Sequence, residues 1–180
     1  MTQFRLAVLS VIVVFAFWGC GLLSPLAPSA DPPPENTPIN DPPIIPEALP
    51  KADIIAETNN RRIANGFNLL VENQKLNAAA DYKMRDMFAR QYFDHYGPGQ
   101  TSGVVELLQR FGYGYTLVGE NLAMGNFRNA NELLSLWMGS PGHRANILRA
   151  DFKEIGVATG YGIFNGKRTI IAVQIFGTRG

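Results

Sequence analysis

Prolines gather in one part of the chain and confine a compact fold to the residues after it. All but two of the 12 prolines lie between Ser24 and Pro50. Proline stops helices and has no backbone N–H to donate to a sheet. Such a stretch prefers the extended polyproline II conformation and acts as a semi-rigid spacer. We therefore assign residues 24–51 to a proline-rich linker and expect residues 52–180 to form one domain.

An uncharged, mostly apolar run precedes the linker. It extends over 18 residues, from Leu6 to Leu23, behind a short, weakly positive start that carries Arg5. About 20 helical residues cross a bilayer, so this run is interpreted as a signal-peptide core or a minimal membrane span. Residues 1–23 are therefore predicted to export the chain. They would put the domain on the outer face of the cytoplasmic membrane, in the cell envelope or outside the cell.

The single cysteine, Cys20, lies near the end of the apolar run. It follows Gly19, which is typical of a bacterial lipoprotein signal, whereas Phe17 and Trp18 are not. Three alternatives stay open: lipidation at Cys20, an uncleaved N-terminal anchor, and ordinary cleavage near Ala30. One cysteine also excludes an intrachain disulfide, so the fold depends on its core.

Composition indicates a folded domain with an ordinary surface. Hydrophobic residues make up 46% of the chain and charged residues 17%, which argues against global disorder. The net charge is +1, and residues 21–50 carry four acidic residues and no basic one, so the domain itself is mildly basic. Its basic residues are scattered without interleaved aromatic residues. Nucleic-acid binding is therefore not expected.

Periodicity predicts helices in the first part of the domain and strands at its end. An apolar stretch at Ile170–Val173 indicates a central strand covered on both faces. Helices before and between strands give a layered α–β–α arrangement. The predicted helices are Asp53 to about Asn65, Leu76–Gln91, Val104–Phe111 and Asn129–Met138, and the predicted strands are 155–158 and 169–176, joined through Asn165-Gly166.

Several helical residues carry specific expectations. Asp53 is predicted to cap the first helix, and Asn129 with Glu132 forms a capping-box pattern. That pattern explains Glu132 without a functional role. Lys83 lies on the apolar stripe of the second helix and is expected to extend its charged end to solvent. Trp137 is expected in the core.

The two histidines, His95 and His143, lie in unusual settings. His95 comes just after the second predicted helix. Ser140 followed by Pro141 is typical of an N-cap and first helical residue, which puts His143 in a first helical turn. The positive end of a helix disfavours imidazolium, so a neutral ring able to ligate metal or accept a proton is favoured. Asn146, behind His143, is expected to bond nearby backbone.

Short motifs along the domain are together similar to those of a known family. They are Asn59 with Arg62, Tyr92-Phe93-Asp94-His95, Gly119-Glu120-Asn121-Leu122-Ala123, the block from Trp137 to Leu148, and Phe176-Gly177. About residues 52–178 therefore resemble the CAP superfamily in its bacterial form. That superfamily comprises cysteine-rich secretory proteins, antigen 5 and pathogenesis-related 1 proteins, and its module is also called the SCP-like domain. The resemblance implies an α+β fold, an α–β–α sandwich with a small antiparallel sheet between helix layers.

The resemblance also implies a cleft and its residues. His95 and His143 match the two histidines of the family, and Glu120 matches its first acidic residue. Ser140 stands where the eukaryotic forms carry a second acid. Some members bind zinc or another divalent cation, which makes His95 and His143 candidate metal ligands, although zinc sites want at least three protein ligands. A hydrogen-bonded His–Glu–His cluster that joins loops explains the same residues without a ligand.

Functions from three classes remain as hypotheses. The first is a non-catalytic binding module, tethered to the membrane, whose cleft at His95, Glu120 and His143 takes a lipid, wall polymer, protein or divalent metal. The second is a protease-like or wall-degrading hydrolase, with His143 and Glu120 as its acid–base pair and a metal as an optional aid. Ser140 is the nearest nucleophile in sequence, but the expected capping role would occupy its hydroxyl. The third is a structural spacer or adhesion protein.

Overall fold

The computed structural model describes residues 7–13 and 42–180. The predictions for Cys20 and for most of the linker lie outside the described residues. None of the described helices is long and apolar enough to cross a membrane. In chain order the elements are β1 (Ala7–Val13), α1 (Lys51–Ala64), β2 (Val71–Glu72), α2 (Gln74–Arg90), α3 (Val104–Arg110), β3 (Leu117–Gly125), α4 (Ala130–Gly139), α5 (Pro141–Ile147), β4 (Glu154–Phe164) and β5 (Lys167–Thr178).

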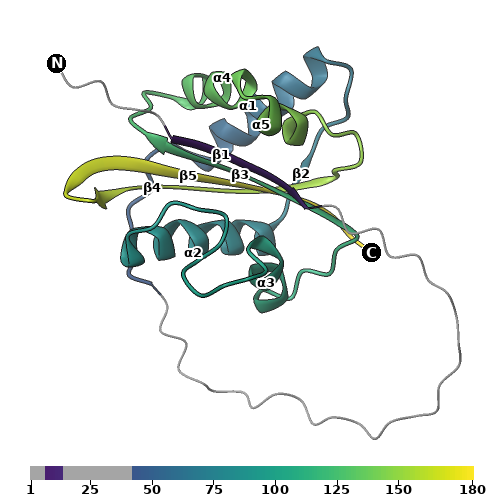
Figure 1. The fold of residues 1–180 in the computed structure, drawn as a ribbon. Helices are drawn as coiled ribbons and strands as arrows, with labels where there is room; N and C mark the ends of the chain where they lie inside the picture. The colour runs from purple at the N-terminus through teal and green to yellow at the C-terminus, as the bar shows by residue number, and fades with distance from the viewer. Residues whose placement is uncertain (1–6, 14–41) are drawn as a thin grey trace, which may run out of the picture.

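Helices cover both faces of one sheet (Figure 1). Helices α1, α4 and α5 lie on one face, and α2 and α3 lie on the other. The strand order is β1-β3-β5-β4-β2, and every pair is antiparallel except the short pair of β2 with β4. The predicted α–β–α sandwich is confirmed, with one short parallel pair that makes the sheet mixed.

Strand β5 runs through the middle of the sheet, between β3 and β4. Its side chains alternate between two cores, as a strand covered on both faces requires. Ile171, Val173 and Ile175 pack on the side of α2, whereas Ile170, Ala172 and Phe176 pack on the side of α1 and α4. The central strand predicted at Ile170–Val173 is therefore confirmed.

Turn and cap residues mark most of the element boundaries. Asn165 and Gly166 join β4 to β5 with φ angles of 47° and 75°, the left-handed region that a two-residue hairpin turn needs. Asn129 caps α4 and accepts a hydrogen bond from the Glu132 N–H, as predicted. The prediction that Asp53 caps α1 is wrong, because the helix begins two residues earlier. Asp53 instead lies in the first turn, where the helix dipole favours an acid.

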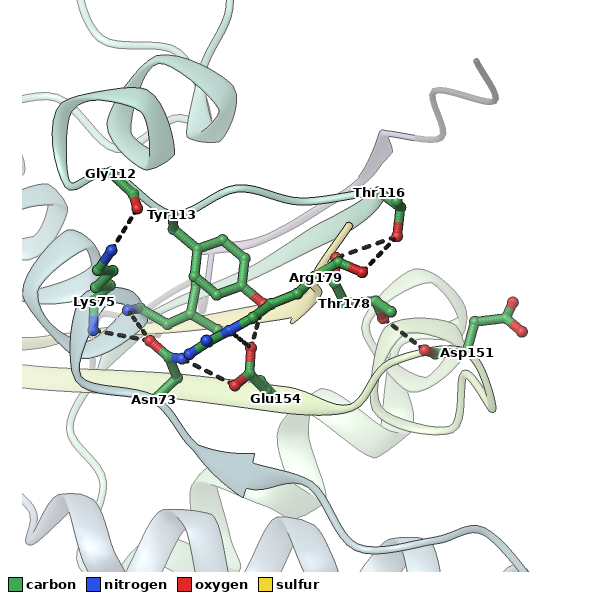
Figure 2. A network of polar contacts seen from close by, with 10 residues as sticks. Asn73, Lys75, Gly112, Tyr113, Thr116, Asp151, Glu154, Thr178 and Arg179 are labelled. Carbon is green, nitrogen blue, oxygen red and sulfur yellow. Dashed lines mark hydrogen bonds and ion pairs between the residues drawn. The ribbon is translucent and has the colours of Figure 1, made fainter. Parts of the chain in front are cut away.

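A polar cluster joins the end of the sheet to the start of α2 (Figure 2). Glu154 accepts hydrogen bonds from the Tyr113 hydroxyl at 2.7 Å, Arg179 Nε at 3.1 Å and Asn73 Nδ2 at 3.0 Å. Burial opposes ionisation of Glu154, but these hydrogen bonds outweigh it and lower the pKa of the carboxyl. Tyr113 also lies against Gly177, where a Cβ would come within 2.3 Å of its hydroxyl.

The first strand comes from the predicted export segment. β1 pairs antiparallel with β3, from Ala7 opposite Met124 to Val13 opposite Val118. The sequence suggests a signal-peptide core or a membrane span here, and the structure describes residues 7–13 as extended chain. Val and Ile make up most of this strand, and both favour β structure. β3 offers the edge that they pair with.

Candidate functional site

His95 and Glu120 form a buried pair on the α2 face of the sheet. His95 Nδ1 lies 2.6 Å from Glu120 Oε1, and the two side chains are 4% and 1% exposed. Val118 and Leu122 lie two residues before and after Glu120 on β3, so the three side chains share one face of the sheet. The two apolar side chains pack in the same core as α2. A carboxylate can only accept, so this contact assigns the proton to Nδ1. In a neutral ring, Nε2 is then the free acceptor or ligand atom.

A buried lysine completes this side of the site. Lys83 is only 2% exposed, so the prediction that its charged end reaches solvent is wrong. Its ammonium donates to the His95 carbonyl O at 3.0 Å and to the Tyr92 hydroxyl O at 3.3 Å, and these partners replace water. Burial lowers the pKa of Lys83, while the Glu120 carboxylate raises it. Lys83 therefore fixes the His95 backbone and supplies a countercharge to Glu120.

His143 approaches β3 from the opposite layer. It is fully buried in the first turn of α5, which confirms its predicted position. Asn121 Nδ2 donates to the His143 carbonyl O at 3.3 Å, and Asn146 Nδ2 donates to the Glu120 carbonyl O at 3.2 Å. The structure thus brings His95 and Glu120 into direct contact. It attaches the His143 helix to the same strand from the other side.

Buried amides link four elements beneath α5. Gln174 Nε2 donates to Thr58 Oγ1 at 2.8 Å, and Asn121 Nδ2 donates to Gln174 Oε1 at 3.0 Å. Asn146 Nδ2 donates in turn to Asn121 Oδ1 at 2.9 Å. Asn146 thus bonds β3 through the backbone of Glu120 and the side chain of Asn121. This network crosses α1, β5, β3 and α5, and each amide fixes the orientation of the next.

The structure also places three other residues that the sequence singled out. Trp137 is fully buried and its Nε1 donates to the Leu122 carbonyl O at 3.3 Å, which confirms the core prediction. Ser140 is the N-cap of α5, but its side chain makes no capping hydrogen bond, so the expected occupation of its hydroxyl is wrong. Glu132 accepts from the Arg128 N–H at 3.0 Å, as a residue at a helix start would.

Two atoms of the buried pair have no hydrogen-bond partner within the described residues. They are His95 Nε2 and Glu120 Oε2. Buried polar atoms are almost always paired, so these two call for a partner that the described residues do not supply, such as a water or a polar group of a ligand. A carboxylate bonded to Nδ1 is also the arrangement that orients Nε2 toward a metal.

The fit to a metal is incomplete. Among residues 7–13 and 42–180, no group of three or more His, Cys, Asp or Glu side chains could hold a metal ion. Zinc sites in proteins use at least three such ligands. The described residues do not supply that set.

A hollow of about 430 Å³ lies elsewhere on the domain. Its lining includes Glu47, Lys51, Asp81 and Thr159, from the end of the linker, α1, α2 and β4. The histidines and Glu120 are not part of this lining. The buried pair is therefore separate from this hollow.

Residues 55–176 match the model of the cysteine-rich secretory protein family, CAP. The chain belongs to this family. The match includes His95, Glu120 and His143 and contains no cysteine, because the only one in the chain is Cys20. The chain is thus related to the family by fold and motif rather than by disulfides.

The chain is similar to several bacterial proteins. It is 36% identical over 104 residues to the uncharacterized protein YkwD of Bacillus subtilis (strain 168), covering 58% of this chain and 40% of YkwD. An extracellular protein containing an SCP domain from Bacillus anthracis str. Ames is 30% identical with a TM-score of 0.60, over 72% of this chain and 40% of that one. An outer surface protein from Borrelia burgdorferi is 21% identical with a TM-score of 0.63, over 76% and 100%, and this likeness concerns the fold alone. The chain spans less than half the length of YkwD.

Proposed function

We propose that the chain is an exported, membrane-tethered protein whose CAP domain is a non-catalytic binding module for a cell-envelope ligand. The observation that carries the proposal is the buried His95–Glu120 pair with its unpaired Nε2 and Oε2 atoms. These atoms can bond a polar group of a ligand that reaches them. Export is supported by the apolar run Leu6–Leu23 and by the similarity to a protein described as extracellular.

The pairing of Glu120 favours binding over hydrolysis. The hydrolase hypothesis assigns the acid–base pair to His143 and Glu120, but Glu120 Oε1 is bonded to His95 Nδ1. The carbonyl of His143 is fixed to β3 by Asn121. The Glu120 contact therefore orients the His95 ring, and not the His143 ring that the hydrolase hypothesis uses as its base. Turnover of casein or peptidoglycan that His143→Ala abolishes in a folded chain would reverse this choice.

Binding to separated envelope components tests the proposal. The full chain and its His95→Ala and Glu120→Gln variants are incubated with membrane-lipid vesicles, purified wall polymer and envelope proteins. Glu132→Gln is the matched control, because that acid lies at the exposed start of α4. Loss of a buried charged hydrogen bond costs about 2 kcal/mol or more, or at least tenfold in affinity. We expect that loss for His95→Ala and Glu120→Gln only. Equal retention of all four folded proteins would contradict the proposal.

The mode of tethering is tested separately. We propose that Cys20 carries the lipid, because the chain's one cysteine follows Gly19 at the end of the apolar run. Cells supplied with radiolabelled fatty acid should label the wild-type chain and leave Cys20→Ala unlabelled. Label that persists in Cys20→Ala would contradict this assignment and favour the uncleaved anchor.

A further inference from the structure

Strand β3 has one edge that the domain itself does not use. Within residues 42–180 it pairs on one side with β5, and its other side pairs with β1 from the N-terminal segment. The backbone N–H and C=O groups of an edge strand that point outward remain unpaired until another strand supplies partners. This edge therefore accepts a strand, and β1 demonstrates the direction and register in which it does so.

The accepting edge lies beside the candidate site. In the register of the two strands, Val11 lies opposite Glu120 and Ser10 lies opposite Asn121. Glu120 carries its side chain to the layer of His95, whereas Asn121 bonds the backbone of α5 on the other layer. Helix α5 also contacts β1. A strand on this edge is therefore flanked by His95 and Glu120 on one side and by α5 on the other.

The segment that occupies the edge has a competing conformation. Residues 7–13 belong to the apolar run Leu6–Leu23, which as a helix would be about 27 Å long, close to the thickness of the hydrocarbon core. Inside a bilayer the backbone must satisfy its hydrogen bonds within the segment itself. The same residues cannot then pair with β3. Insertion or removal of the N-terminal segment thus leaves the edge of β3 open.

We propose that the outer edge of β3 is a binding site for an extended apolar peptide, which pairs antiparallel with β3 beside His95 and Glu120. Residues 7–13 are its occupant within the chain whenever the N-terminal segment is outside a bilayer. The inference rests on the proposed binding function and names the chemical class of its ligand. Main-chain hydrogen bonds supply affinity in this mode of recognition, and the flanking side chains supply selectivity.

Amide hydrogen exchange tests the site in the full chain inserted in lipid nanodiscs. The probe is a peptide with the sequence of residues 6–14 followed by two lysines for solubility. The matched control carries Val11→Pro, which removes one backbone donor from the middle of the strand. We expect the probe to slow exchange at Leu117–Gly125 at least tenfold and the proline peptide to leave it unchanged. Unchanged exchange with both peptides, or equal slowing by both, would overturn the proposal.

Cysteine pairs test the internal occupant. Both pairs are made in a Cys20→Ser chain. Ala7→Cys with Met124→Cys places the two thiols on residues that lie opposite each other. Val13→Cys with Met124→Cys places them six residues apart in register, at about 20 Å. In aqueous solution the first pair should cross-link at least tenfold more than the second, and nanodisc insertion should remove that excess. Equal yields of both pairs would refute the assignment of residues 7–13.

The two failures can be told apart. If envelope components bind in a manner that depends on Glu120, but the peptide does not protect β3, the peptide class is wrong and the binding function stands. If neither binds, both proposals fall together.

Discussion

Arg62 binds three backbone carbonyl groups from inside the domain. It is fully buried in α1. Its Nε donates to the Asn68 O at 2.7 Å, and its Nη1 donates to the Ile147 O at 2.7 Å and the Arg149 O at 2.9 Å. One guanidinium thus joins the loop after α1 to the end of α5, the helix that carries His143.

Replacing this residue should remove a large share of the stability. Arg62→Met keeps an unbranched apolar stem and removes every donor. Each buried carbonyl left without a donor costs about 1–3 kcal/mol. Burying the cation itself costs free energy, as the lowered pKa of Arg62 indicates, and the methionine variant is relieved of that cost. We therefore expect a net loss of about 4 kcal/mol, less than the full sum for three unpaired carbonyls. A domain of this size has a free energy of unfolding of about 5–15 kcal/mol.

Equilibrium unfolding in guanidinium chloride measures this loss. Arg61→Met is the matched control, because the neighbouring Arg61 pairs with Glu57 and Asn131 at the surface. Such pairs contribute about 1 kcal/mol or less. A midpoint for Arg62→Met that coincides with that of Arg61→Met, at equal slope, would refute the role assigned to the three carbonyl bonds.

Two further predictions concern packing and pH. Gly156→Ala would put a Cβ about 2.2 Å from the backbone carbon of Leu76, so urea unfolding should reveal a loss of about 3 kcal/mol, whereas Gly114→Ala has nothing within 4 Å and should leave the midpoint unchanged. Tyr113→Phe removes a hydrogen bond that helps to lower the pKa of Glu154, so it should cost about 1 kcal/mol at pH 7. The lowered pKa of Glu154 stabilises the fold above the ordinary value of 4.5, and this contribution fades as the pH falls through the lowered value. The variant should therefore lose less stability than the wild type between pH 7 and pH 3. Parallel profiles of stability against pH would contradict this.

Local chemistry was sufficient to predict most helices and the last two strands. The Asn165-Gly166 turn and the apolar run at Ile170–Val173 each depend on neighbours in sequence, so the pattern alone predicts them. Strand β3 was missed because Gly119, Glu120 and Asn121 disfavour a strand by local propensity. It forms because β5 pairs along its whole length, and that contact is long-range.

The sequence named the members of the candidate site but gave no indication of how they pair. The motifs named His95, Glu120 and His143, yet nothing in the sequence says that His95 and Glu120 meet on one face while His143 arrives from the other. Lys83 was misplaced because a lysine on an apolar stripe usually reaches solvent. Its actual partners, the His95 carbonyl and the Tyr92 hydroxyl, lie in the turn that follows α2. Only the fold brings them within reach.

The central position of β5 has a consequence for the export that we propose. β3 and β4 belong to one sheet only through β5, which is the last described strand to be made and the last to emerge from a translocating chain. Before residues 167–178 have crossed the membrane, the two halves of the sheet have no shared partner and their cores stay open. In the export that we propose, the domain would stay unfolded, and able to pass through a channel, until residues 167–178 have crossed. A spacer that already links the emerged chain to the membrane would then let the sheet close at the place where the protein is needed.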